Sequence, residues 1–167
     1  MKVGKGVVAG GVFSATSEVF VVVCCSLIML VSSYVRVPFY PVPFTMQTFV
    51  VVAVSIFAGR GRALRSLLLF TLIRSPFRMT GGYILGFFAV PLIIGDGALK
   101  FSDRRLLARI FCSHLAVLAM GTAVLVCFAG SPFISGFLFF VPAEIFKGLL
   151  SFALVRAAGK FRKYVER

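Results

Sequence analysis

An acid and a base stand within one helical turn of each other near the end of this sequence. Glu144 and Lys147 are three residues apart in the apolar segment GFLFFVPAEIFKGLLSFALV, residues 136–155. A helix would place both side chains on one face, close enough to pair. Charged side chains inside an apolar helix are costly, so the pair needs a reason. It either locks this helix onto its neighbours or forms a polar binding patch that faces a cavity.

The binding interpretation has a definite chemistry. The Glu144 carboxylate can accept two N–H groups, and the Lys147 ammonium can donate to a carbonyl or a carboxylate. Phe140, one helical turn before Glu144, can cover a flat ring. This set suits a small polar ring system. A lone carboxylate with no His or Cys nearby in the sequence is a poor metal site, so we expect no metal and no cofactor.

Two connecting segments carry further candidate ligand contacts. The three prolines of VRVPFYPVPFTMQT (35–48) favour a stiff, extended segment before a helix that starts near Thr45 and holds Gln47 one turn in. In TGGYILGF (80–87), Gly82 belongs to a tight turn into a helix with free N–H groups, and Tyr83 adds a ring with a polar tip. We predict that these four residues contact a ligand. A rigid connector and a capped turn are the alternatives.

Small residues line one stripe of the first apolar segment. Gly10 and Ser14, and likewise Gly11 and Ala15, are four residues apart, a spacing that allows close approach of another helix. The stripe either packs within the bundle or forms a docking face for another membrane subunit.

Two titratable residues lie in apolar segments without an evident role. Glu18 lies near the middle of the first apolar segment, which would place it in mid-membrane if that segment spans one, and it needs a partner that the sequence does not identify. We interpret His114 as structural. The sequence contains no nucleophile–base pair, metal cluster or nucleotide-binding motif, so we expect no enzyme activity.

The composition indicates that these residues belong to a membrane protein. Of the 167 residues, 60% are hydrophobic and 14% are charged, whereas a soluble domain is about 45–50% apolar and about 25% charged. A spanning helix needs about 20 mostly apolar residues. We predict an all-α integral membrane protein, one domain over residues 1–167. Its six transmembrane helices cover about 7–35, 43–58, 61–75, 81–95, 106–129 and 137–158.

Charge decides the number of spans and their orientation. One long helix over 63–94 would carry Arg74, Pro76 and Arg78 into the membrane, so we predict a break there. With six spans and both termini cytoplasmic, fourteen of the 18 Lys and Arg residues lie inside, which satisfies the positive-inside rule. The net charge of +13 then needs only membrane lipid as its counterpart, without nucleic acid. The predicted location is the cytoplasmic membrane.

Three segments carry a family resemblance when they are taken together. VPFTMQT at 42–48, TGGYILGF at 80–87 and SPFISG…FVPAEIFKG at 131–148 resemble the BioY family, the biotin-specific S components of energy-coupling factor (ECF) transporters. The resemblance implies an S-component-like bundle that captures biotin from outside and depends on a separate coupling module with ATPase subunits. It also implies that Glu144 and Lys147 help to bind biotin.

The chain departs from the family pattern at three places. The family's acid is usually Asp, whereas this chain has Glu144. The docking stripe of such components is often Ala-x-x-x-Ala, and here it has Gly and Ser variants. The connection between the third and fourth helices is shorter than is usual in the family. Two alternatives stay open: an S component for another vitamin, and a structural membrane protein in which the Glu–Lys pair only locks the last helix.

Overall fold

Six α-helices make up most of the described part of the chain. The computed structural model describes residues 5–37, 44–74, 81–129, 137–138 and 140–165, and only the backbone of 5–15, 36–37, 44, 129 and 160–165. The helices are α1 (Lys5–Ser32), α2 (Gln47–Ala58), α3 (Arg60–Arg74), α4 (Gly81–Ile94), α5 (Asp103–Ala129) and α7 (Val141–Val165), with a 3-10 helix η1 (Ala98–Lys100) before α5. The sequence predicts this number of helices.

The long apolar stretch over 63–94 is divided into two helices. α3 ends at Arg74 and α4 begins at Gly81, so the described residues on the two sides of the predicted break belong to separate helices. Pro76 and Arg78 lie in 75–80, outside the described residues.

The segment before α2 contains a short β pair where the sequence predicts a plain extended connector. Strands β1 (Arg36–Val37) and β2 (Phe44–Thr45) are antiparallel, in a register that places Arg36 opposite Thr45. Two extended stretches that run side by side satisfy their backbone N–H and C=O groups by pairing. Because Thr45 belongs to β2, α2 begins at Gln47, two residues after the expected position. Gln47 is therefore the first residue of the helix and not one turn in.

The last two helices start at residues other than those expected. α5 begins at Asp103, where an acidic side chain in the first turn favours the helix N-terminus. α7 begins at Val141, later than the expected 137, and this places Pro142 in its first turn. Proline is tolerated there because its missing N–H would have no partner within the helix.

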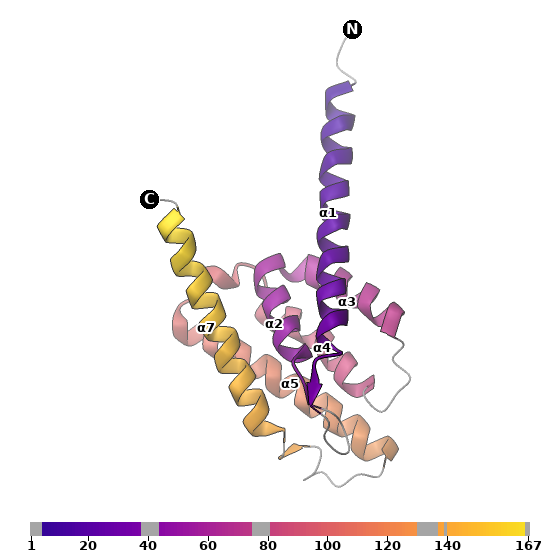
Figure 1. Cartoon of the computed structure of the whole chain (residues 1–167), viewed down its shortest axis with the longest axis vertical. Coiled ribbons are helices and arrows are strands. Elements are labelled where there is room, and N and C mark those ends of the chain that lie inside the picture. Colours follow the sequence, from indigo (N-terminus) through magenta and orange to yellow (C-terminus); the bar gives the residue numbers. More distant parts are fainter. Residues whose placement is uncertain (1–4, 38–43, 75–80, 130–136, 139, 166–167) are drawn as a thin grey trace.

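The helices pack into one bundle, in which α2 lies between α1 and α7 (Figure 1). The start of α1 and the end of α7 extend to the same side of the bundle, and β1 and β2 lie at the opposite end. The core that the helices share includes Met29, Leu67, Phe70, Val90 and Ile110, all fully buried.

The closest helix contact joins α4 to α5. A Cβ added at Gly82 would lie 2.5 Å from Cβ of Val124, and one added at Gly86 would lie 2.8 Å from Cα of Val117. Such distances are shorter than van der Waals contact, so the two backbones approach this closely only because α4 has glycine at these positions. This contact holds the first turn of α4 against the far half of α5.

The surface of the bundle is strongly apolar. Phe20, Leu72 and Phe128 are 68%, 82% and 87% exposed. Exposed apolar surface on this scale is typical of contact with a membrane or a partner. By length and composition, α5 can cross a membrane over Asp103–Phe128, while Thr16–Ser32, Gln47–Ala58 and Gly81–Ile94 are shorter apolar helices.

Candidate functional site

Three titratable side chains meet where α5 packs against α7. The Lys147 Nζ lies 2.5 Å from Oε1 of Glu144, and the His114 Nδ1 lies 2.6 Å from Oε2 of the same carboxylate. Glu144 is 9% exposed, Lys147 2% and His114 1%. The predicted proximity of Glu144 and Lys147 is confirmed. We call these three residues the buried cluster.

Local helix geometry fixes the α7 members of the buried cluster. Glu144 donates its backbone N–H to the Phe140 carbonyl at 2.9 Å, which closes the first turn. Lys147 follows three residues later, and its carbonyl accepts the Ser151 hydroxyl at 2.9 Å. A buried charge is tolerable only when it is paired and hydrogen-bonded. In this cluster one carboxylate and one ammonium balance each other, so the third member need not carry a charge.

An apolar groove lies beside the buried cluster. Its cavity of about 250 Å³ is lined by His114 and Glu144 together with six apolar residues, Phe111, Cys112, Leu115, Leu118, Val141 and Ile145. This combination of a mostly apolar wall and a few polar groups is typical of small-molecule sites.

An aromatic pair adjoins the groove. The rings of Tyr83 and Phe140 have centroids 6.4 Å apart at an interplanar angle of 48°. Phe140 shares an apolar cluster with Leu118, which lines the groove, and Tyr83 packs against that cluster. The Tyr83 ring covers Gly121, where an added Cβ would lie 2.2 Å from a ring carbon. The sequence therefore needs glycine at 121 to leave room for the Tyr83 ring in this position.

The other predicted contact residues occupy different places. Thr45 is in β2 and Gln47 opens α2. Gln47 is buried, and among the described residues its Nε2 has no hydrogen-bond partner. Gly82 packs against Val124 in the α4–α5 contact. The structure thus brings Glu144, Lys147, Phe140 and Tyr83 to one region, and it gives Gly82 a packing role that the sequence did not predict.

Sequence reasoning did not assign His114 to the site. The residue is 30 positions from Glu144 in the chain, so no local spacing relates the two. One signal was present: within the apolar stretch 110–129, His114 is the only titratable side chain other than the cysteines. A polar residue isolated in this way in an apolar helix needs a partner.

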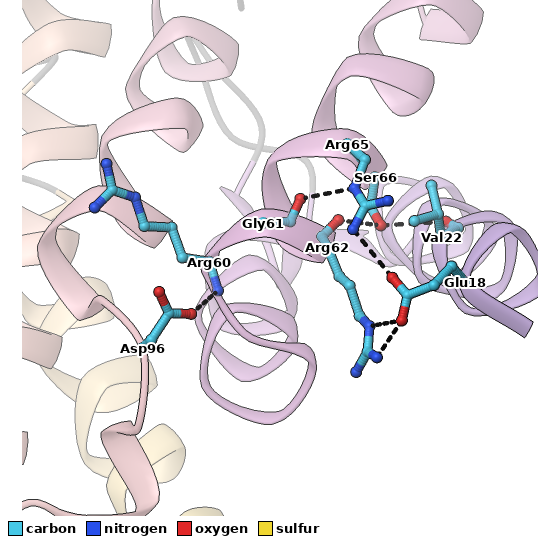
Figure 2. Close-up of polar contacts among 8 residues, drawn as sticks. All are labelled: Glu18, Val22, Arg60, Gly61, Arg62, Arg65, Ser66 and Asp96. Atoms are coloured by element: carbon cyan, nitrogen blue, oxygen red, sulfur yellow. Dashed lines mark hydrogen bonds and ion pairs between the residues drawn. The ribbon is translucent and has the colours of Figure 1, made fainter. Parts of the chain in front are cut away.

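A second ion cluster gives Glu18 the partners that the sequence could not identify (Figure 2). Its carboxylate lies between two arginines of α3, where Arg62 Nε donates at 2.9 Å and Arg65 donates through an NH2 group at 3.0 Å. The side chains of Glu18, Arg62 and Arg65 are 30%, 43% and 56% exposed. Near this cluster, Asp96 accepts the backbone N–H of Arg60 at 2.9 Å. We call Glu18, Arg62 and Arg65 the exposed cluster.

Within the described ranges, no three His, Cys, Asp or Glu side chains come together as a metal ion would require.

Comparison with known proteins identifies the family. The BioY family model matches residues 5–75 and 73–164, nearly the whole chain. The chain belongs to the BioY family. Its fold is similar to a solved structure described as the crystal structure at 2.1 Å of the S-component for biotin from an ECF-type ABC transporter, with a TM-score of 0.65 and 17% sequence identity. The similarity covers 88% of this chain and 93% of that one. No curated protein matches the sequence.

The BioY-like segments gather at one end of the bundle. VPFTMQT leads into α2, TGGYILGF opens α4 and FVPAEIFKG opens α7. These helix starts lie away from the end at which α1 begins (Figure 1). The two matched parts of the BioY model overlap at 73–75, at the end of α3.

The proposed docking stripe of this BioY-family chain lies on the first turns of α1. Gly10, Gly11, Ser14 and Ala15 belong to the helix, but their side-chain surroundings are outside the described part of the chain. Their role as a docking face stays a prediction.

Proposed function

We propose that this BioY-family protein binds biotin and serves as the substrate-capture S component of an ECF-type transporter in the cytoplasmic membrane. One observation carries the proposal: a buried Glu144–Lys147–His114 cluster lies beside an apolar groove in a chain of this family. A structural ion pair would need no groove next to it.

The chemistry of biotin suits this arrangement. Biotin combines a flat ureido-thiophane ring with an apolar chain and a carboxylate. The apolar wall of the groove and the Tyr83–Phe140 pair suit the ring and the chain. Lys147 can meet either the ureido oxygen or the carboxylate. Most of the affinity would come from apolar burial, and a few placed polar groups would set the orientation.

The distribution of charge supports a cytoplasmic position for the end at which α1 begins. At that end, arginines of the basic segments bond to acidic side chains of other segments: Arg60 to Asp96, Arg62 to Glu18, and Arg156 to Asp103. Basic residues concentrate on the cytoplasmic side of membrane proteins. The groove and the helix starts of the BioY-like segments would then be reached from outside, through six spans with both termini inside.

Partners follow from the same proposal. The chain contains no nucleotide-binding motif, so sustained uphill uptake requires a coupling module with its own ATPases. We propose that this module docks on the α1 stripe of Gly10, Gly11, Ser14 and Ala15, and that anionic lipid contacts the basic end.

A ligand titration tests the proposal. Purified protein in detergent is heated in the presence of biotin, thiamine, riboflavin or nicotinate. A ligand at 100 times its Kd stabilises the folded state by about 2.7 kcal/mol, and we expect this increase with biotin alone. An increase with another vitamin would keep the fold and replace the ligand. No increase with any of them would favour the structural alternative, in which the ion pair only locks α7.

A further inference from the structure

We infer that His114 is a direct ligand contact, and that its Nε2 accepts an N–H group from the ring of the bound ligand. The inference rests on the proposed function and extends the site from α7 to α5. It starts from three observations: the bond of Nδ1 to Glu144, the unpartnered Nε2, and the position of the residue on the wall of the groove.

The contact with Glu144 fixes the tautomer. A carboxylate oxygen can only accept a hydrogen bond, so Nδ1, at 2.6 Å from Oε2, carries the hydrogen. Glu144 is already neutralised by Lys147. A neutral imidazole keeps the cluster uncharged in its apolar surroundings, whereas a further charge would be buried without a counter-ion. In the neutral ring with hydrogen on Nδ1, Nε2 is an acceptor.

That acceptor lacks a hydrogen-bond partner within the described part of the chain. The Nε2 atom is also buried. Buried polar atoms without a partner are rare in folded proteins because each one costs the energy of desolvation. The carboxylate of Glu144, in contrast, already bonds to Lys147 through Oε1 and to His114 through Oε2. A ligand that enters the groove lies against His114, whose buried Nε2 is the atom that still lacks a partner.

The acceptor selects the chemical class of the ligand. A cyclic urea or amide presents N–H groups at the edge of a flat ring, and such an edge fits a single acceptor on an apolar wall. For biotin, one ureido N–H would bond to His114, next to the Glu144–Lys147 pair. Glu144 also holds the imidazole in the tautomer that can accept.

Two substitutions separate contact from positioning. In His114→Asn the amide N–H can replace Nδ1 toward Glu144, but nothing replaces Nε2. In His114→Gln the longer amide can place an oxygen near the position of Nε2, and the Nδ1 donor is lost. We expect His114→Asn to bind biotin roughly tenfold more weakly, with His114→Gln affected less. The reverse order would make His114 a positioning residue for Glu144 and overturn the inference.

A spectroscopic readout tests the atom itself. His114 is the sole histidine of the sequence, so protein labelled with ¹⁵N-histidine gives signals from one imidazole. We expect an unprotonated Nε2 whose ¹⁵N resonance shifts toward that of a hydrogen-bonded acceptor when biotin is added. An imidazolium ring, or an Nε2 resonance unchanged by saturating biotin, would overturn the inference.

Failure of the inference differs from failure of the proposed function. If wild-type protein binds biotin and His114→Asn binds it equally well, only the role of His114 falls. If the wild type binds no biotin, both the proposed function and the role of His114 are contradicted. Glu18→Gln, far from the groove, is the matched control and should bind biotin like the wild type. A variant that is not monodisperse on size exclusion is replaced by the other amide variant, and the ¹⁵N experiment needs no substitution.

Discussion

The exposed cluster and the buried cluster are built from similar groups in different surroundings. Each has one glutamate held by two nitrogen-bearing side chains from the chain's helices. The side chains around Glu18 are 30–56% exposed, whereas those around Glu144 are 2–11% exposed.

This difference in exposure determines what each cluster can do. An exposed ion pair gains little because water solvates its members nearly as well when they separate. A buried pair is held together by the penalty for leaving either charge alone. Only the buried cluster can therefore hold its side chains in one fixed orientation toward a ligand. The following experiments test this contrast, starting with the largest expected effect.

Removing the ammonium of the buried cluster should have the greatest consequence. Lys147→Met keeps most of the side-chain volume but leaves the Glu144 carboxylate buried without its cation. We expect a destabilisation of about 3–5 kcal/mol and loss of biotin binding. Thermal unfolding and a biotin titration measure the two effects. Wild-type stability would show that the cluster is solvated and that the contrast is wrong.

Neutralising both charges together should restore stability and not binding. In Glu144→Gln with Lys147→Met no charge is left unpaired, and the glutamine oxygen can still accept from His114. We expect a melting temperature well above that of Lys147→Met alone, since a neutral replacement of a buried pair is often tolerated. Biotin affinity should stay low. A double variant as unstable as the single one would mean that packing, and not charge imbalance, causes the loss.

The smallest effect should come from the exposed cluster. Glu18→Gln removes the negative charge between Arg62 and Arg65, but water can solvate both arginines. We expect a melting temperature within the measurement error of the wild type, and unchanged biotin affinity. A decrease comparable to that of Lys147→Met would reverse the comparison, because it would show that burial does not rank the two clusters.

Much of the fold could be predicted because apolar runs and charges report on single helices. Arg74 and Pro76 predicted a break, and α3 and α4 are separate helices; the apolar lengths predicted the number of helices. The pairing of β1 with β2 could not be predicted in the same way, because it depends on two segments lying side by side. It moved the start of α2 from the neighbourhood of Thr45 to Gln47.

The same distinction, between features of one helix and contacts between helices, applies to the candidate site. Glu144 and Lys147 are three residues apart, so helix geometry alone predicts their contact. His114 reaches Glu144 across 30 residues, and Arg62 reaches Glu18 across 44. Such contacts depend on how the helices pack, about which one sequence carries little information. The buried cluster likewise depends on α5, because that helix supplies His114 to the Glu144 carboxylate.

The length of α3 has a consequence for the lipid around the protein. Its 15 residues rise about 22 Å, against a hydrocarbon core of about 30 Å, and its outward side chains include Leu68, Leu72 and Ile73. In the proposed arrangement of six spans, the bilayer would thin beside this helix, at a modest cost for each ångström of mismatch. Lipids with shorter acyl chains should therefore collect along α3, and the protein should be more stable in thin bilayers than in thick ones.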